Sequence, residues 1–600
     1  MAIVPGFRRN RVGAAALPAT KVKTGYMDDS TPVPRQWGIE PGYHDVFGEW
    51  HPAPEASVQK VMAALSAQGT RPAHFGAGHP EILAFQGDGR RLWGLAVQLY
   101  AVRSGRNWGI GDFADLREIV RLAAPSGIAA VGVNPLHALF LDRPEVVSPY
   151  APSSRLFLNP LYIAVDVLEE FAGADEGELA SARRGDLVDY PQVARLKLAA
   201  LRGAYERFVN DGSAARREDF ERFRNERGES LLRLGCYEVL RRKFVPRPWW
   251  EWPQEWKNPD RPTLEELREQ DADCGFYEYL QWVADRQLAE CQQVARDGGM
   301  AMGLYIDLAV GVDPSGFDAW ADQQTVVAGL SVGAPPDEFN RAGQEWGLAP
   351  FNPHALPEHD FAAFRKLLVG AMRHAGVIRL DHVLGLMRLF MIPRGETPRE
   401  GVYVRFPFQQ LLDVVADESN RYRCVVIGED LGTVPEGFRE AIMQRGLWCY
   451  RVMQFERWHP GEFKPPSDYP AQALATFNTH DLPTYRGWVG GQDIALRRSL
   501  GLHPGETEGV REQSRRALEH VASSGGAGFA GVAAFLADTP SRLIMVGIED
   551  LLDVVEQINM PGTWMEYPNW RRKLPIRLED WAAQPGFRDV VDVFRRKGRA

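Results

Sequence analysis

The feature that most constrains the fold is a series of short apolar runs that alternate with segments of helical periodicity. Each run ends in polar residues, as expected of strands that are buried on both faces of a parallel sheet. The alternation predicts an α/β protein of the (β/α)8 TIM-barrel class; periodicity alone also allows a doubly wound sheet. The eight runs cover residues 95–100, 128–136, 302–310, 377–386, 424–432, 450–456, 474–481 and 542–552.

The spacing of these runs also predicts how the chain is organised. Residues 1–35 are aperiodic and contain several prolines, so we expect a loose N-terminal tail. Helical spacing in residues 56–68 predicts a small helical unit within residues 36–91, followed by a barrel domain over residues 92–600. The long interval at residues 165–300 is rich in Arg, Glu, Leu and Trp at helical spacing. It predicts a mostly helical insertion between the second and third strands.

Composition argues against several classes of function. The 600 residues carry a net charge of −10 and no long basic run, which argues against nucleic acid or an anionic membrane as the main partner. No apolar stretch is long enough to span a membrane, and the N-terminus lacks the apolar core of a signal peptide, so we expect a cytoplasmic protein. The five cysteines form no C-x-x-C pair, which predicts free thiols rather than a disulfide framework or zinc site.

Charged side chains fall at the ends of several predicted strands. In a barrel the carboxyl ends of the strands build the active site, so these groups are expected to meet at one mouth. A lone Asp at such a position is more often a helix cap, and the paired acids of IGEDLG would also suit a hard metal ion. The groups are Asp307 and Asp313 on either side of the end of the third run, Arg379, Asp381 and His382 in the fourth, Glu429 and Asp430 in the fifth, and His480 and Asp481 in the seventh.

Other motifs narrow the chemistry. NWGIGD at residues 107–112 contains G-x-G, but Asp112 would repel a pyrophosphate, so we do not expect a dinucleotide site there. The sequence contains no P-loop, H-E-x-x-H or G-x-S-x-G motif. Several aromatic residues lie in polar loops, where they would either pack the loop on the barrel or offer flat apolar faces to sugar rings: Trp108, Tyr150, Trp346, Trp564 and Trp570.

Seven segments together resemble the amylomaltases, which are 4-α-glucanotransferases of glycoside hydrolase family 77. They are NWGIGDFADL, SPYAPSSRLFLNPLYI, GAPPDEFNRAGQEWG, IRLDHVLGLMRLFMIP, IGEDLG, NTHDLPT and PGTWMEYPNWRRKL, and they occur in family order between Trp93 and Lys573. The later motifs look closest to the longer bacterial amylomaltases of maltose metabolism. The resemblance implies an enzyme that transfers an α-1,4-glucan segment from a maltodextrin donor to glucose or another maltodextrin, without a metal or organic cofactor.

The resemblance also implies roles for individual residues. Asp381 matches the nucleophile, Glu429 the general acid/base, and Asp481 the acid that stabilises the transition state. Arg379 would orient Asp381 and keep it ionised. The residues matched to substrate binding are Arg379, His480, Tyr150 and Asp313, together with Asp337, Gln344 and Trp346 in a lid loop at residues 337–346. Within that loop, Glu338 and Phe339 stand where many family members carry two aromatic residues, which puts a stacking contact at position 338 in doubt.

These residue types suit a retaining mechanism. One carboxylate forms a glycosyl ester and an acid protonates the leaving oxygen, with the two carboxyl groups about 5–5.5 Å apart. Attraction from Arg379 would lower the pKa of Asp381, and neighbouring acids would raise that of Glu429. The alternatives are an α-amylase-like hydrolase with the same three acids, a non-catalytic glucan-binding barrel and a metal-dependent barrel enzyme. The oligomeric state is not indicated by the sequence.

Overall fold

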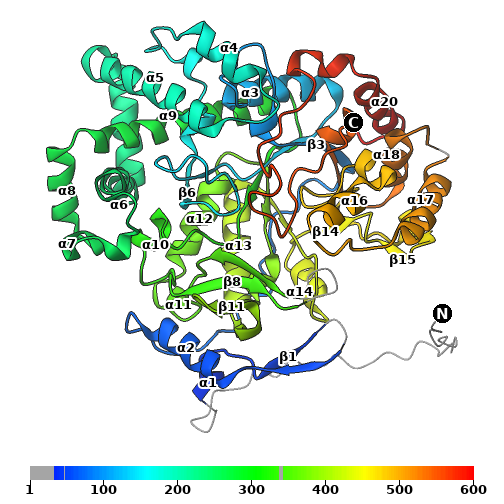
Figure 1. Ribbon diagram of the computed structural model, residues 1–600, viewed down its shortest axis with the longest axis horizontal. Coiled ribbons are helices and arrows are strands. Elements are labelled where there is room, and N and C mark those ends of the chain that lie inside the picture. Colours follow the sequence, from blue (N-terminus) through cyan, green and yellow to red (C-terminus); the bar gives the residue numbers. More distant parts are fainter. Residues whose placement is uncertain (1–32, 46–47, 337–341, 524) are drawn as a thin grey trace.

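A computed structural model describes residues 33–45, 48–336, 342–523 and 525–600 (Figure 1). Its centre is a sheet of eight parallel strands, and each lies within or across the start of one predicted run. Consecutive strands are neighbours, and a parallel bridge between Ile427 and Trp448 joins the two ends of the sheet. The sheet therefore closes into the predicted TIM barrel. Its strands are β3 (Leu92–Val97), β4 (Ala130–Val133), β7 (Gly303–Leu308), β10 (Val377–Leu380), β13 (Val425–Gly428), β14 (Cys449–Val452), β17 (Ala473–Thr476) and β18 (Leu543–Gly547).

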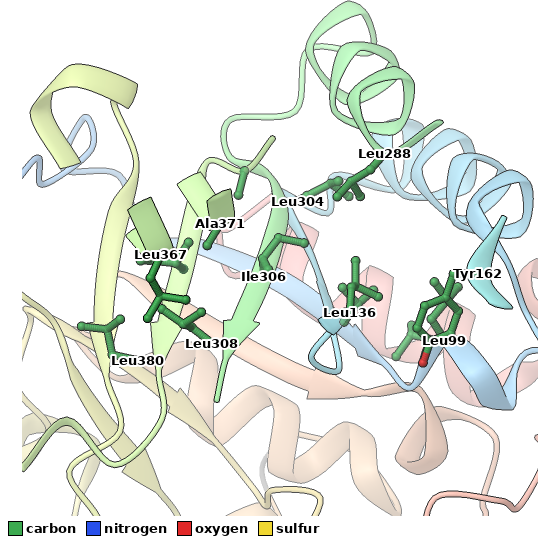
Figure 2. Packing of buried hydrophobic residues seen from close by; sticks show 14 of the residues in the cluster. Leu99, Leu136, Tyr162, Leu288, Leu304, Ile306, Leu308, Leu367, Ala371 and Leu380 are labelled. Atoms are coloured by element: carbon green, nitrogen blue, oxygen red, sulfur yellow. The ribbon is translucent and has the colours of Figure 1, made fainter. Parts of the chain in front are cut away.

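The third barrel strand, β7, shows how the sequence separates core from site. Alternate side chains of a strand point to opposite faces. Figure 2 shows Leu304, Ile306 and Leu308 of β7 packed among buried leucines of the surrounding helices. Tyr305 and Asp307 alternate with them and line a cavity inside the barrel. An unbroken apolar outer face thus anchors the strand, while its inner face carries a charge toward the site.

The α-helices outside the N-terminal segment and outside the insertion between β4 and β7 lie between barrel strands or after the last one. They are α3 (Phe113–Ala123), α10 (Phe317–Ala321), α11 (Ala355–Glu358), α12 (Ala362–Met372), α13 (Phe408–Tyr422), α14 (Phe438–Gln444), α15 (Tyr485–Gly490), α16 (Gln492–Ser499), α17 (Glu508–Ala522), α18 (Phe529–Asp538), α19 (Ile548–Leu551) and α20 (Pro585–Arg596). No helix in the part of the chain described here is long and apolar enough to cross a membrane.

The interval between β4 and β7 contains the predicted helical insertion, which is confirmed. A short β-ribbon comes first, β5 (His137–Ala138) with β6 (Ser154–Leu158). Six helices follow: α4 (Glu176–Arg184), α5 (Tyr190–Asp211), α6 (Ala214–Phe244), α7 (Gln254–Lys257), α8 (Arg261–Gln270) and α9 (Asp273–Asp297). Helix α9 packs on both α6 and α3, so it joins the insertion to the barrel (Figure 1).

A second sheet, which the sequence did not predict, lies beside the barrel. Its four antiparallel strands have the order β12 (Val402–Arg405), β11 (Arg388–Pro393), β8 (Leu330–Ala334) and β9 (Gln344–Leu348). Two of them follow the fourth barrel strand and two follow the third. They thus build an extension from two loops at the carboxyl end of the barrel.

The N-terminal segment packs against this second sheet (Figure 1). It contains α1 (Val33–Gln36), a hairpin of β1 (Gly42–His44) and β2 (Trp50–Pro52), and α2 (Glu55–Ser66), the predicted helix. The backbone N–H of Arg405 donates to the Gly38 carbonyl, and that of Glu40 to the Tyr403 carbonyl, each at 2.9 Å. The predicted domain boundaries stay predictions, and residues 1–32 of the predicted tail lie outside the described residues.

Two further sequence expectations concern local structure. Asp112 of NWGIGD is the N-cap of α3: its carboxylate accepts from the backbone of Ala114 and Asp115 and pairs with Arg106 at 2.6 Å. This buried acid therefore has a structural role at the start of α3. All five cysteines are free and buried, as predicted. One more hairpin, β15 (Arg457–His459) with β16 (Glu462–Phe463), follows β14.

Candidate active site

The predicted acids follow the carboxyl ends of three barrel strands. Asp381 comes directly after β10, Glu429 directly after β13, and Asp481 shortly after β17. A fourth acid, Asp307, lies on β7 next to β10, where it is paired in register with Arg379. Because all barrel strands are parallel, these groups share one end of the barrel.

Asp381 is held by the guanidinium of Arg379. Arg379 Nη2 lies 2.9 Å from Asp381 Oδ1, while its Nη1 lies 2.7 and 2.8 Å from the two oxygens of Asp307. Burial raises the pKa of Asp381 to about 6 although Arg379 acts to lower it. The predicted effect of Arg379, which is to lower the pKa of Asp381, is confirmed, but the cost of desolvating the carboxylate is larger and the net shift is upward. The group still ionises below neutral pH.

Glu429 is positioned by backbone rather than by a cation. Its Oε2 accepts from the His382 N–H at 3.0 Å, and its Oε1 accepts from the Leu431 N–H at 2.7 Å. His382 adopts a left-handed conformation with φ of 45°, which turns the chain directly after Asp381. Burial raises the pKa of Glu429, and Arg379 and the two N–H groups oppose the rise. The predicted direction is confirmed, but burial rather than neighbouring acids is its main cause.

Tyr150 connects the third and seventh strands. Its hydroxyl donates to Asp307 Oδ2 at 2.6 Å and lies 3.2 Å from His480 Nδ1. The Tyr150 and His480 rings stack with centroids 4.7 Å apart, and Trp570 packs on both. His480 Nε2 lies 3.4 Å from Asp481 Oδ2. Burial disfavours both charged forms, but attraction between the two groups raises the pKa of His480 and lowers that of Asp481.

Sequence reasoning missed the residues that hold Asp481. Asn559 Nδ2 donates to Asp481 Oδ1 at 2.6 Å, and the Asn559 backbone N–H donates to the His480 carbonyl at 3.1 Å. Gln557 Nε2 donates to the carbonyls of Asp481 and Asn559, and Tyr567 donates to the Gln557 carbonyl. The only sequence signal was the polar pair in QIN just before the loop PGTWMEYPNW.

Two of the predicted lid residues, Gln344 and Trp346, lie on β9 of the second sheet. The Trp346 ring meets the His382 ring edge-on, with centroids 5.1 Å apart, so β9 reaches the residue next to Asp381. Trp346 Nε1 donates to Gln344 Oε1 at 3.2 Å. Asp337 and the two departures from the family pattern, Glu338 and Phe339, lie outside the described residues.

Asp313 is engaged locally in a turn. Its Oδ1 accepts from the backbone N–H of Ser315 at 2.7 Å and from the Ser315 hydroxyl at 2.6 Å. Its own backbone N–H donates to the Pro152 carbonyl at 2.8 Å, which ties the turn to the loop that carries Tyr150. Within the described ranges, no hydrogen bond or ion pair links Asp313 to the three predicted acids. Its place in the substrate site remains a prediction.

The metal-site alternative for IGEDLG does not fit the surroundings of Asp430. Asp430 is fully buried and pairs with Arg439 at 2.6 Å and Arg451 at 3.0 Å. It also accepts from the Tyr450 backbone N–H at 2.8 Å. These contacts fill its lone pairs, so Asp430 acts as a structural anchor beside Glu429. The adjacent acids Glu429 and Asp430 therefore lie in different surroundings.

A cavity of about 90 Å³ lies inside the barrel next to these groups. Tyr150, Asp307, Arg379 and His480 line one part of it, and residues of the other barrel strands and of the segments that follow them, including β3, β4, β14, β17 and β18, line the rest. The site therefore combines a cation-held carboxylate, a backbone-held carboxylic acid, a third acid paired with histidine, and aromatic surfaces. This set can protonate a leaving oxygen and form an ester on the opposite carboxylate.

Comparison with known proteins decides which family carries this site. The sequence profile described as 4-alpha-glucanotransferase matches residues 97–578. The chain belongs to the 4-alpha-glucanotransferase family. It is 37% identical over 546 residues to a 4-alpha-glucanotransferase of Mycobacterium tuberculosis, covering 84% of this chain and 74% of the relative. It is 35% identical over 534 residues to that of Haemophilus influenzae, covering 81% and 76%.

Solved structures agree with this family assignment. The amylomaltase of Corynebacterium glutamicum superposes with a TM-score of 0.79 at 27% identity, covering 93% of this chain and 98% of that one. The amylomaltase of Streptococcus agalactiae, solved in complex with acarbose, gives a TM-score of 0.69 at 19% identity, covering 85% and 100%, and shares the fold. The resemblance to amylomaltases and the activity as a 4-α-glucanotransferase are confirmed. This glucanotransferase acts on α-glucans.

Proposed function

We propose that this glucanotransferase moves an α-1,4-glucan segment from a maltodextrin donor to the 4-hydroxyl of glucose or of another maltodextrin, with Asp381, Glu429 and Asp481 as its catalytic residues. The observation that carries the proposal is the different support of two carboxyl groups at neighbouring strand ends. Asp381 is paired with Arg379, whereas Glu429 is held by two backbone N–H groups. The Arg379 guanidinium favours the anionic form of Asp381, whereas burial raises the pKa of Glu429 against the effect of its two N–H donors, so Glu429 can hold and release a proton.

In the first half-reaction an Asp381 oxygen attacks the anomeric carbon of the donor while Glu429 gives its proton to the departing 4-oxygen. The glycosidic C–O bond breaks and an ester to Asp381 forms, so the shorter glucan or glucose leaves with the proton. In the second, the 4-hydroxyl of the acceptor gives its proton to the Glu429 carboxylate and attacks the same carbon. The ester breaks, Asp381 is regenerated, and the α configuration is retained.

Asp481 stabilises the positive charge that develops on the sugar in the transition state of each half-reaction. His480 keeps the pKa of Asp481 low, and Asn559 fixes one of its oxygens. We infer that His480 and Tyr150 bind hydroxyls of the same sugar, and that Arg379 acts through Asp381. Asn559 and Gln557 act as positioning residues.

Transfer over hydrolysis requires that an acceptor glucan compete with water. Binding energy and partial closure of the site supply that advantage. We assign closure to the segment that ends at Trp346, with Asp337 and Gln344 contributing contacts to the bound glucan and Asp313 binding nearby. Trp346 packs on His382, next to the proposed nucleophile, which supports this assignment. The two half-reactions require no cofactor, and we propose that the enzyme works in the cytoplasm.

Glucose labelled with ¹⁴C tests the choice of acceptor. With unlabelled maltotetraose as donor, we expect label to enter maltose and longer maltodextrins, because glucose then accepts the transferred segment. Reduction of these products with borohydride followed by complete acid hydrolysis should place the label in sorbitol, because the labelled glucose forms their reducing-end unit. Label that stays in free glucose while the donor is consumed would contradict the proposed acceptor.

A further inference from the structure

The end of β18 carries two acids that the proposed reaction does not use. Glu549 and Asp550 follow Gly547 in the run VGIEDLL and line the barrel cavity. Only 7% of Glu549 and 2% of Asp550 is exposed. Buried carboxylates are costly unless they are paired or bound to a cation. Their surroundings therefore indicate what occupies this part of the cavity.

Neither acid has a cationic partner among the described residues. Asp550 accepts from Asn478 Nδ2 at 3.1 Å and from the Tyr485 backbone N–H at 2.6 Å. No other described residue donates a hydrogen bond to the Glu549 carboxylate. The two cations that line the same cavity are engaged elsewhere: Arg379 with Asp307 and Asp381, and His480 with Asp481. Burial raises the pKa of Glu549 to about 8 and of Asp550 to about 7, as expected of acids without a counter-ion.

Because Gly547 has no side chain, oxygen atoms of the neighbouring residues can lie close to one another at the end of β18. A Cβ placed on Gly547 would lie 3.3 Å from Glu549 Oε2, 3.7 Å from Asp550 Oδ2 and 3.9 Å from Asn478 Oδ1. Gly547 is paired in register with Ala96 on β3, so the end of that strand is adjacent. Gln98 lies two residues further on, lines the cavity, and has a buried Oε1 that accepts no hydrogen bond from any described residue.

This part of the cavity thus presents more acceptor oxygens than the described residues supply with donors: Asp550 has two donors, whereas Glu549 and Gln98 Oε1 have none from another described residue. Two carboxylates and two amide oxygens, with space for water, match the ligands of calcium, which takes six to eight oxygens in flexible geometry. We propose that Glu549, Asp550, Asn478 and Gln98 form a binding site for a hard metal cation, with calcium as the best fit. The cation would join the ends of β3, β17 and β18 behind the sugar site and stabilise that side of the barrel mouth.

Calcium binding to the full chain tests the proposal. The protein is treated with chelator, dialysed into calcium-free buffer at pH 7.5, and titrated with calcium chloride by calorimetry, with thermal unfolding followed in parallel. We expect about one calcium per chain and a rise in Tm of several degrees. Glu549→Gln removes a charged ligand and should weaken binding at least about tenfold. Gly547→Ala, which changes no charge, places a methyl group among the ligands and should also weaken binding.

The hairpin β1–β2 supplies a matched control. Asp45, Glu49 and His51 are the one group of three potential metal ligands found in the described part of the chain. Glu49→Gln should leave calcium binding and the Tm rise unchanged. No calcium binding by the wild-type protein would overturn the proposal, and would indicate that protons neutralise the two acids. Binding that survives both Glu549→Gln and Gly547→Ala would also overturn it, because the cation would then lie elsewhere.

Discussion

Asp381→Asn is expected to lower transferase activity about 10⁴-fold or more while leaving the barrel folded. Asn has nearly the same shape but cannot form the glycosyl ester, so the first half-reaction loses its nucleophile. Arg379 keeps its bidentate partner Asp307, at 2.7 and 2.8 Å, and is not left as an unpaired buried charge. The measurement is kcat/KM for maltotriose, with thermal unfolding of the same samples.

Asp553→Asn supplies the control for this change. Asp553 is exposed and has φ of 55°, a conformation that Asn tolerates well, and it lies outside the site. The activity of the Asp553→Asn variant should match that of the wild type. A folded Asp381→Asn protein with activity within tenfold of the wild type would refute the role of Asp381.

The pH dependence of kcat/KM gives an independent check on Asp381. Its pKa is raised to about 6, and only the carboxylate can attack. Activity should therefore fall as the pH decreases through about 6, and this acidic limb should be absent from the small residual activity of Asp381→Asn.

Glu429→Ala is expected to lower activity on maltotriose by about 10²–10⁴-fold, because neither proton transfer retains its catalyst. The loss should be much smaller for the first step with an α-maltosyl fluoride donor, since fluoride leaves without a proton. The ester on Asp381 should then accumulate, because no base activates the acceptor. Mass spectrometry of the intact protein, followed by peptide mapping, should detect one added maltosyl group on the peptide that contains Asp381.

Small anions extend the test of Glu429. Azide needs no base and should speed turnover of the trapped ester in Glu429→Ala, giving an α-glycosyl azide, but should not speed the wild-type reaction. Equal losses on maltotriose and the fluoride, with no ester, would assign Glu429 a structural role. Its bonds to the His382 and Leu431 N–H groups make thermal unfolding a necessary companion measurement.

The barrel could be predicted from the sequence because each of its strands coincides with a short apolar run that is separate from the next. Arg379 and Asp381 stood out because they interrupt such a run. The second sheet was not predicted. Its edge strands β9 and β12 mix exposed and buried residues, and β9 alternates between partly buried and exposed positions up to Leu348. Strands of this kind depend on pairing across the loops of two barrel strands, a long-range property that local periodicity does not report.

The acids of the site could be predicted from the sequence, but the groups that hold these acids in place were harder to predict. Glu429 is held by backbone N–H groups. One of them comes from the bend at His382, and the residue types around this bend do not indicate it. Asn559 comes from a segment 78 positions beyond Asp481. Burial raises the pKa of Asp381 and Arg379 lowers it, and the sequence pattern does not show which of these two effects is larger.

Incubation with maltotriose alone tests the central claim, transfer of glucan segments rather than hydrolysis, most directly. Product lengths and total reducing ends are followed over the same time course. We expect glucose together with maltopentaose and longer chains, while the number of reducing ends stays constant, because each broken bond is replaced by a new one. A rise in reducing ends that matches the loss of maltotriose would show that water is the acceptor and would contradict the account.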